Sequence, residues 1–370
     1  MIAPTGGIAS SSNGFTVDLV GGMRADDNVR RQEDGPGDLS FVLQPSLKYQ
    51  HSFGDLRGSL SYEGGYESYT DLNAENVLNH SIKGDADYRF SKRFRSNLKL
   101  GYDVSSESRD DLTGRDTGNA APDQLVRRSV RLKSVYGRRI AKAELHAEVG
   151  HSASRYQNNA QQGRDIDQYD VNLLAYYNFT ARFSTVLELR RTYLDYRGGA
   201  ALDGTNTTLL AGLRWDATAR TSGEFKVGRQ QRQFYDSAGG QNSIGESWDV
   251  NVLWEPRSFS KVRLNTSREV QEAGTAGVGT LVNSSYRASW THGLTEDLTL
   301  TAEAQFDRTR LGGRKDDRMR LSSALAYKIS ENVQVSAEYA RTVSESTQLG
   351  SEFENNVIFL QFRAKYSDLK

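Results

Sequence analysis

Five histidines and no cysteine limit the chemistry that this 370-residue chain could perform. The histidines are scattered, and none has the HExxH spacing of a zinc protease. The sequence also lacks a GxSxG nucleophile elbow and a P-loop. Without cysteine there can be no disulfide and no thiolate metal site. We therefore predict that the chain is not an enzyme and has no cofactor and no metal.

One short stretch, "ELHAE", places Glu144, His146 and Glu148 at every second position. Alternate residues of a β-strand point to the same side, so the three side chains would form a row. Such a row could bind a metal ion or a proton. It is more often the hydrated wall of a pore, which is the interpretation we favour. The acidic segments "ADDNVRRQED" and "SESRDDLTGRDTG" lack the ligand spacing of an EF-hand and are expected to be solvated loops.

The elements that would carry these residues repeat along the whole chain. In the stretch from Tyr169 to Arg190, apolar and polar residues alternate on both sides of the short turn "TAR". This period of two is typical of a strand whose two faces meet different surroundings. Similar pairs of segments recur about every 40 residues, which indicates an array of hairpins.

The connections between these segments alternate in length. Eight are short, such as "SFGD", "SKR" and "SEN", and about nine are long and rich in Gly, Asp, Ser and Asn, among them "LGGRKDD" and the segment from Ser105 to Asp123. This count predicts about 18 antiparallel strands, within the range of bacterial outer-membrane barrels. The last segment, "NVIFLQFRAKY", is expected to pair with the first, "GFTVDLVGGMR". We divide the chain into a periplasmic N-terminal segment, 1–14, and an outer-membrane β-barrel, 15–370.

Alternation alone fits either a two-layer sandwich or a closed barrel with an apolar outer face and a wet lumen. Aromatic residues near almost every short turn, such as Tyr49, Phe90, Phe179 and Trp254, favour the barrel, because aromatic rings gather where a membrane meets water. We predict a single closed antiparallel transmembrane β-barrel in the bacterial outer membrane, with short periplasmic turns and long extracellular loops. "MIAPTGGIASSSNG" has no signal-peptide pattern, and we interpret it as the start of a mature chain.

The polar face of the predicted strands carries many charges of both signs, with a small basic excess. Such a wall would hydrate a charged or polar solute and offer it weak, exchangeable contacts. The predicted pore-lining residues are Glu63, Lys99, Arg131, Glu144, Glu188, Arg190, Lys226, Arg263, Arg287 and Glu303. The whole chain has 47 basic and 47 acidic residues, which argues against a nucleic-acid partner.

A second group of charges falls on the apolar face, always near the long-loop end of a strand. Charge on the lipid face is costly at the midplane of a membrane and tolerated near its surface. We expect these arginines to contact phosphates of the outer-membrane glycolipid, lipopolysaccharide, although ordinary snorkelling of their side chains would explain them equally well. They are Arg128, Arg155, Arg191, Arg229, Arg268, Arg308 and Arg341.

The hairpins "YYNFTARFSTVLEL", "LRWDATARTSGEFKVG" and "LAYKISENVQVSAEYAR" resemble those of the outer-membrane β-barrel porins found in bacterial exopolysaccharide gene clusters. The resemblance covers nearly the whole chain. It implies export of a secreted polysaccharide, with a periplasmic polysaccharide-export protein as partner. The chain departs from barrels generally at its end, "AKYSDLK", where the last aromatic residue, Tyr366, is followed by four others.

The resulting expectation is an outer-membrane pore that secretes an exopolysaccharide. The alternatives are a general or substrate-selective diffusion or uptake porin, and a structural barrel that anchors a partner complex. The sequence leaves the direction of transport and the solute open.

Overall fold

The chain forms one β-sheet, seen in a computed structural model that describes residues 13–110, 121–138, 141–218, 220–236, 242–271 and 280–368. Within these ranges the sheet has eighteen strands, accompanied by three short 3-10 helices. The strands are β1 Gly14–Asp26, β2 Asp38–Phe53, β3 Leu56–Tyr69, β4 Val77–Arg89, β5 Phe94–Ser106, β6 Gln124–Gly137, β7 Ala143–Tyr156, β8 Ile166–Asn178, β9 Phe183–Tyr196, β10 Gly204–Thr218, β11 Thr221–Phe234, β12 Ser243–Arg257, β13 Ser260–Gln271, β14 Leu281–Gly293, β15 Leu298–Leu311, β16 Arg314–Ser330, β17 Val333–Ser346 and β18 Phe353–Ser367. The helices are η1 Asn73–Glu75, η2 Gln161–Arg164 and η3 Ala200–Leu202. No helix in the described ranges is long and apolar enough to cross a membrane.

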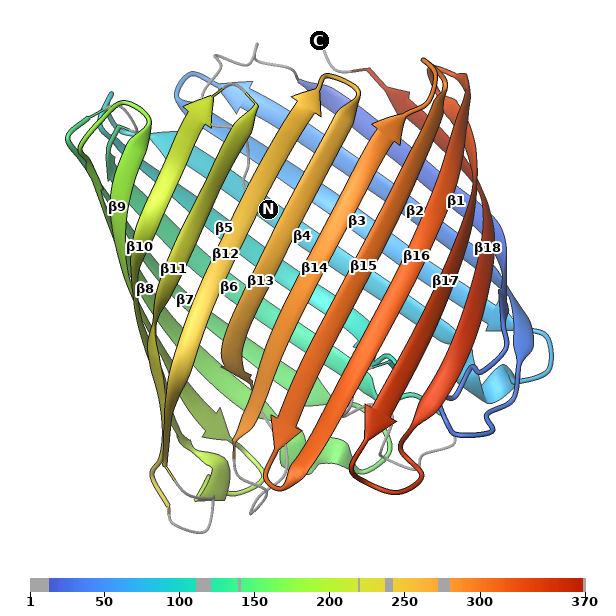
Figure 1. Cartoon of the computed structure of the whole chain (residues 1–370). Coiled ribbons are helices and arrows are strands. Elements are labelled where there is room, and N and C mark those ends of the chain that lie inside the picture. Colours follow the sequence, from blue (N-terminus) through green and yellow to red (C-terminus); the bar gives the residue numbers. More distant parts are fainter. Residues whose placement is uncertain are drawn as a thin grey trace.

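Each strand pairs antiparallel with the next one along the chain, and the first strand also pairs with the last. In this closing seam Val17 lies opposite Tyr366, and Met23 lies opposite Leu360. Closure leaves no strand edge unpaired, which matters because lipid cannot hydrogen-bond to a free edge. Figure 1 shows the resulting barrel of tilted strands. The predicted single closed antiparallel barrel of about 18 strands is confirmed.

The outer face of the barrel is apolar and unpacked. Leu173 is 45% exposed and Phe362 is 49% exposed, although a two-layer sandwich would bury both side chains. Their neighbours along each strand point inward and are mostly polar. The sandwich alternative therefore does not apply, and the outer face requires a lipid environment.

Exposed aromatic rings lie on the outer face at the end of the barrel where β1 begins and β18 ends. Phe53, Phe90 and Tyr136 are among the most exposed of them. Several rings pack in pairs across or along strands, such as Phe15 with Tyr49 at 4.9 Å between ring centroids. Their position next to the short turns agrees with an aromatic belt at a membrane surface.

The connections at this end of the barrel span two to five residues, whereas most of those at the other end span six to seventeen. The exception is "LGGRKDD", which we expected to be a long loop. The structure shows that this prediction is wrong, because β15 continues to Leu311, β16 starts at Arg314, and two glycines turn the chain. Gly312 has a φ of 58°, which glycine adopts without strain. The connection between β3 and β4, residues 70–76, is a loop that we did not predict.

The division into a segment 1–14 and a barrel 15–370 remains a prediction. Strand β1 begins at Gly14, while residues 1–12 lie outside the described residues. The whole of the predicted loop "EAGTAGVG" and residues 111–120 of the longest loop also lie outside them.

Candidate functional site in the lumen

The inner wall of the barrel is the candidate site, because it gathers charged side chains from most of the strands. The strand register places all ten predicted pore-lining residues at inward positions. Some become neighbours, such as Lys99 opposite Arg131 on β5 and β6, and Arg287 at 3.6 Å from Glu303. Glu63 lies apart from these and pairs with Lys83 at 3.0 Å. The role of these residues in transport remains a prediction.

The densest group of charges on this wall, which we name the wall cluster, contains Glu188, Arg190, Glu224, Lys226 and Asp249. Lys226 Nζ lies 2.7 Å from a Glu188 oxygen, 3.0 Å from Glu224 and 3.1 Å from Asp249. Arg190 donates hydrogen bonds to Glu188 at 2.5 Å and to Asp249 at 3.0 Å. Three carboxylates therefore face two cations. Lys226 reaches Glu188 across β10, where the intervening inward residue, Gly212, has no side chain in the way.

Burial separates Glu188 and Lys226 of the wall cluster, together with Glu144, from the more exposed predicted pore-lining residues. The side chains of Glu188 and Lys226 are 2% and 5% exposed, whereas that of Arg287 is 48% exposed. Charges that are buried and paired hold the wall together and have little contact with a solute. The exposed predicted residues, which can offer contacts to a passing solute, are Arg287, Arg131, Glu63, Lys99 and Arg263.

Next to the wall cluster, an aromatic side chain joins the charged network. The Tyr176 hydroxyl donates a hydrogen bond to Glu224 at 3.2 Å, and the Arg214 guanidinium lies 3.8 Å from the centre of the Tyr176 ring. His146 and Glu144 form a hydrogen-bonded pair at 2.5 Å. The third member of the "ELHAE" row, Glu148, instead pairs with Arg131 at 3.2 Å. In the part of the chain that the structure describes, no cluster of side chains is suited to hold a metal ion.

A recess of about 410 Å³ in the lumen wall lies beside this network. It is bordered by carboxylates, guanidinium groups and amides, so one small solute could meet donors and acceptors together. The inward residues that line it include Arg190, Asp249, Asn251, Asn265, Glu269 and Arg287.

At the long-loop end, the β5–β6 loop reaches into the barrel. Arg31 of the β1–β2 loop donates a hydrogen bond to the Asp110 carboxylate at 2.6 Å. Arg318 on β16 donates a hydrogen bond to the main-chain carbonyl of Asp110. Six strands separate β5 from β16 around the barrel, so these contacts cross part of the lumen. We name Asp26, Arg31, Asp110 and Arg318 the mouth cluster.

The charges of the mouth cluster are tightly paired. Burial alone would raise the pKa of the Asp110 carboxyl, but the attraction of Arg31, its hydrogen bond, and the nearby Arg318 and Arg320 lower it below the ordinary value of 3.8. Arg31 also pairs with Asp26 at 2.8 Å, and these carboxylates raise the pKa of its guanidinium against the opposing effect of burial. Asp110 and Arg31 are therefore both charged at neutral pH.

A second recess, of about 380 Å³, lies between the mouth cluster and the wall. Further ion pairs line it, including Arg24 with Glu67 at 2.7 Å and Arg109 with Glu75 at 3.0 Å. Fixed charges of both signs a few ångströms apart favour hydrated, polar solutes over apolar ones.

Sequence reasoning missed a set of inward apolar residues beneath the loops. Leu194 and Tyr196 at the end of β9 are 3% and 5% exposed, and they pack with Leu202 of the β9–β10 loop. In the β1–β2 loop, Val29 is 4% exposed. The signal was present in the sequence as apolar residues on the inward parity, close to a long loop. These side chains anchor loops inside the mouth of the barrel.

The seven predicted glycolipid-contact arginines all occupy outward positions, each opposite an outward residue of a neighbouring strand. Arg155, Arg308 and Arg341 form ion pairs with carboxylates of the outer face at 2.5 to 2.7 Å. Arg128, Arg191 and Arg268 lie within 6.0 Å of the centre of an aromatic ring. Their contact with a glycolipid remains a proposal.

A protein-family model described as "Putative beta-barrel porin 2" matches residues 15–366, which is nearly the whole chain. No curated protein matches the chain.

Solved structures of similar fold include OccAB2 of Acinetobacter baumannii, at 10% sequence identity and a TM-score of 0.55, with 98% of this chain and 100% of that chain covered. OccK2 (OpdF) of Pseudomonas aeruginosa in complex with glucuronate is 12% identical, with a TM-score of 0.54 and coverage of 95% and 98%. OpdK of Pseudomonas aeruginosa with vanillate is 11% identical, with a TM-score of 0.53 and coverage of 95% and 99%. At these identities the similarity concerns the fold.

Proposed function

Since this chain belongs to the family "Putative beta-barrel porin 2" and is an 18-stranded porin of the bacterial outer membrane, we propose that it is a passive diffusion channel for small hydrophilic solutes, including carboxylates. Membership of a porin family indicates a transporter that is not an enzyme. The size and charge of the solute are what we propose here.

The observation that carries the proposal is the lumen wall itself. Its exposed charges, such as Arg287 and Arg131, are held by single carboxylates at 3.2 to 3.6 Å, so a solute carboxylate can replace the side-chain partner at little cost. Weak contacts of this kind orient a solute and still allow it to leave. The buried ion pairs of the wall cluster keep the surrounding wall rigid while these contacts exchange.

The position of the mouth cluster indicates that the solute is limited in size. Because the β5–β6 loop contacts both the β1–β2 loop and β16, it occupies part of the opening through which a solute would enter. Loops can plug the interior of an outer-membrane barrel, and a loop in the opening limits the size of the solute that can enter.

The relatives suggest which solutes to test first. The two solved Pseudomonas channels bind glucuronate and vanillate, and both solutes are carboxylates. Export of an exopolysaccharide, which the sequence resemblance implied, gains no support from the family match or from the solved structures. A structural barrel that anchors a partner complex is likewise without a specific supporting observation.

The proposal can be tested by conductance across planar bilayers and by swelling of proteoliposomes in sugars and sugar acids of increasing size. We expect an open channel that admits small sugars and excludes long oligosaccharides. Replacing Arg287 with Gln should slow the entry of glucuronate more than that of glucose, because only the sugar acid loses an ionic contact.

The outward Arg191→Gln variant is the matched control and should change neither rate. A barrel that folds correctly but conducts no ions would contradict the proposal. If glucose and glucuronate entry fell equally in Arg287→Gln, the proposal that the channel favours carboxylate solutes would be wrong.

A further inference from the structure

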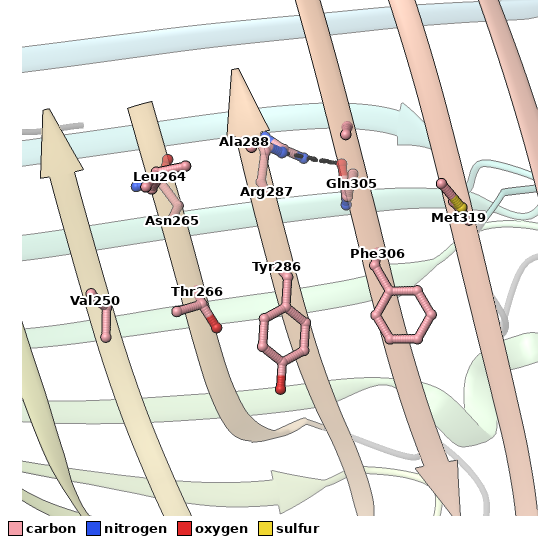
Figure 2. A pocket seen from close by; sticks show the side chains of 11 residues that line it. Val250, Leu264, Asn265, Thr266, Tyr286, Arg287, Ala288, Gln305, Phe306 and Met319 are labelled. Carbon is pink, nitrogen blue, oxygen red and sulfur yellow. Dashed lines mark hydrogen bonds between the residues drawn. The ribbon is translucent and has the colours of Figure 1, made fainter. Parts of the chain in front are cut away.

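A groove of about 370 Å³ lies on the outer face of the barrel, across β12 to β16. Figure 2 shows the side chains of Tyr286 and Phe306 side by side on neighbouring strands, with Thr266 on one flank and Met319 on the other. The register joins these residues in one row, with Thr266 opposite Tyr286, Tyr286 opposite Phe306, and Phe306 opposite Met319.

Small side chains form the floor of the groove. In the next row of outward residues, towards the short-turn end, Ala288 lies opposite Ala304, between Leu264 on β13 and Leu321 on β16. The Tyr286 and Phe306 rings stand above this floor with 6.1 Å between their centroids. Large side chains on either side of two alanines leave a channel for a slender apolar chain.

The row above the groove, towards the long loops, carries positive charge. Arg268 on β13 and Arg308 on β15 lie on opposite sides of Ser284, which is 3% exposed. Arg268 Nη1 donates a hydrogen bond to the Ser284 hydroxyl at 3.1 Å, and its Cζ lies 5.6 Å from the centre of the Trp248 ring. Its Nε has no hydrogen-bond partner among the described residues.

Carboxylates nearby neutralise this charge only in part. Asp317 pairs with both Arg308 at 2.7 Å and Lys315 at 2.8 Å, and Glu345 lies opposite Asp317 on β17. The outward cations of this row and its rim are Arg268, Arg308, Arg310 and Lys315. Four cations therefore face two carboxylates, which leaves a local excess of positive charge that favours an anion.

We propose that this part of the outer wall is a binding site for a phosphorylated glycolipid of the outer leaflet. A phosphate group lies against Arg268 and Arg308, and one acyl chain of the same lipid lies in the groove beneath. Guanidinium groups suit phosphate oxygens because two N–H donors match two acceptors. Cations directly above an apolar groove, at the long-loop end of the strands, match the order of headgroup and chain in the outer leaflet.

Two observations single out this place among the outward arginines. Glu354 pairs with Arg341, whereas Arg308 shares Asp317 with Lys315, and Arg268 forms no ion pair with a carboxylate among the described residues. Arg191 lies over Tyr193, with its Cζ 5.0 Å from the ring centre. Thr207, opposite Arg191 on β10, has Gln231 and not a second cation on its other side. Only Arg268 and Arg308 flank one small residue above a recess, within the residues that the structure describes.

The test measures the affinity of the purified full chain, in nanodiscs of neutral lipid, for a bisphosphorylated hexa-acylated glycolipid. Native mass spectrometry gives the bound fraction. We expect Arg268→Gln to weaken binding about tenfold, the loss typical of one hydrogen bond to a charged group. Ala304→Phe keeps every charge but fills the groove, and should weaken binding by a similar factor.

The control variant, Arg191→Gln, should bind the glycolipid as the wild type does. All variants should keep the wild-type conductance, because none of the changed side chains faces the lumen. This readout also shows that a variant has folded. It separates a failure of the glycolipid site from a failure of the proposed channel function.

The source of the phosphate is tested with two further ligands. The dephosphorylated glycolipid should bind at least tenfold more weakly than the phosphorylated one, and inorganic phosphate should not compete at millimolar concentration. Unchanged affinity in Arg268→Gln or in Ala304→Phe would overturn the proposal, as would equal affinity for the dephosphorylated glycolipid. An equal loss of glycolipid affinity in Arg191→Gln would mean that the lipid is held by a diffuse ring of charge and not at a defined site, which would also overturn the proposal.

Discussion

At the scale of single residues, the position of a residue along its strand determines which face of the barrel its side chain occupies. The neighbouring side chains then determine its role. Lys83 and Lys226 both point inward, as their positions in the alternating pattern predict. Lys83 remains half exposed beside one carboxylate, whereas Lys226 is buried among three. A buried cation removed from such a group leaves its carboxylates unbalanced, which costs more than the loss of an exposed pair.

We therefore predict that Lys226→Met lowers the free energy of unfolding by about 3 kcal/mol, whereas Lys83→Met lowers it by less than about 1 kcal/mol. Urea titration of the barrel in lipid vesicles, followed by tryptophan fluorescence, measures both. The wall cluster also gains net negative charge in Lys226→Met, so the reversal potential in a salt gradient should shift towards cation selectivity. Similar losses of stability in the two variants would show that burial of the wall cluster has no energetic consequence.

At the scale of elements, the strands and short turns are predicted from the sequence more accurately than the long loops. The short turns lie where they were expected, but "LGGRKDD" turned out to be two glycines and two strand ends. Charged residues and glycines occur both in loops and in strands that extend beyond the membrane. Composition therefore cannot distinguish a loop from such a strand end. Contacts between loops, such as Arg31 with Asp110, join segments 79 residues apart and leave no local signal.

The pKa shift of Asp110 gives the loop contact a defined pH dependence. Because its pKa in the folded protein is lowered below 3.8, the ion pair with Arg31 is fully formed above 3.8 and is lost as pH falls through the lowered value. Asp110→Asn removes this pair at every pH. We expect the variant to have a higher single-channel conductance than the wild type at pH 7, because the β5–β6 loop is less firmly held.

The difference between the two proteins should persist from pH 7 down to 3.8 and disappear only below it. Asp34, an exposed residue of the β1–β2 loop, provides the control, and Asp34→Asn should conduct as the wild type does at each pH. A difference that vanished already near pH 6 would mean that another group governs the loop.

At the scale of the whole molecule, closure of the sheet depends on the seam between β1 and β18. Gly22 points inward there, and a Cβ atom at this position would lie 2.7 Å from a ring carbon of Phe359 and closer still to the Leu360 carbonyl oxygen. Gly21, its neighbour, has room for a methyl group, since the nearest atom is 4.0 Å away on Leu43. The two adjacent glycines therefore form a matched pair.

We predict that Gly22→Ala destabilises the barrel by about 1–3 kcal/mol, the usual cost of overpacking, whereas Gly21→Ala changes stability by less than about 0.5 kcal/mol. The fraction of folded protein after refolding into detergent, read from the mobility of unheated samples on a gel, gives a first comparison. Urea titration then gives the free energies. Equal behaviour of the two variants would mean that the seam tolerates a wider spacing than the structure shows.

The architecture could be predicted from the residues alone, because a period of two and alternating connection lengths are local properties that a chain displays along its length. It placed Lys99, Glu188 and Arg287 inside and Leu173, Arg268 and Phe362 outside, since parity on a strand fixes the face. The folded barrel was needed to show which charges are buried, which loops meet across the mouth, and where two alanines open a groove on the outer wall. These features arise between strands that closure and register bring together, and no single segment of the sequence contains them.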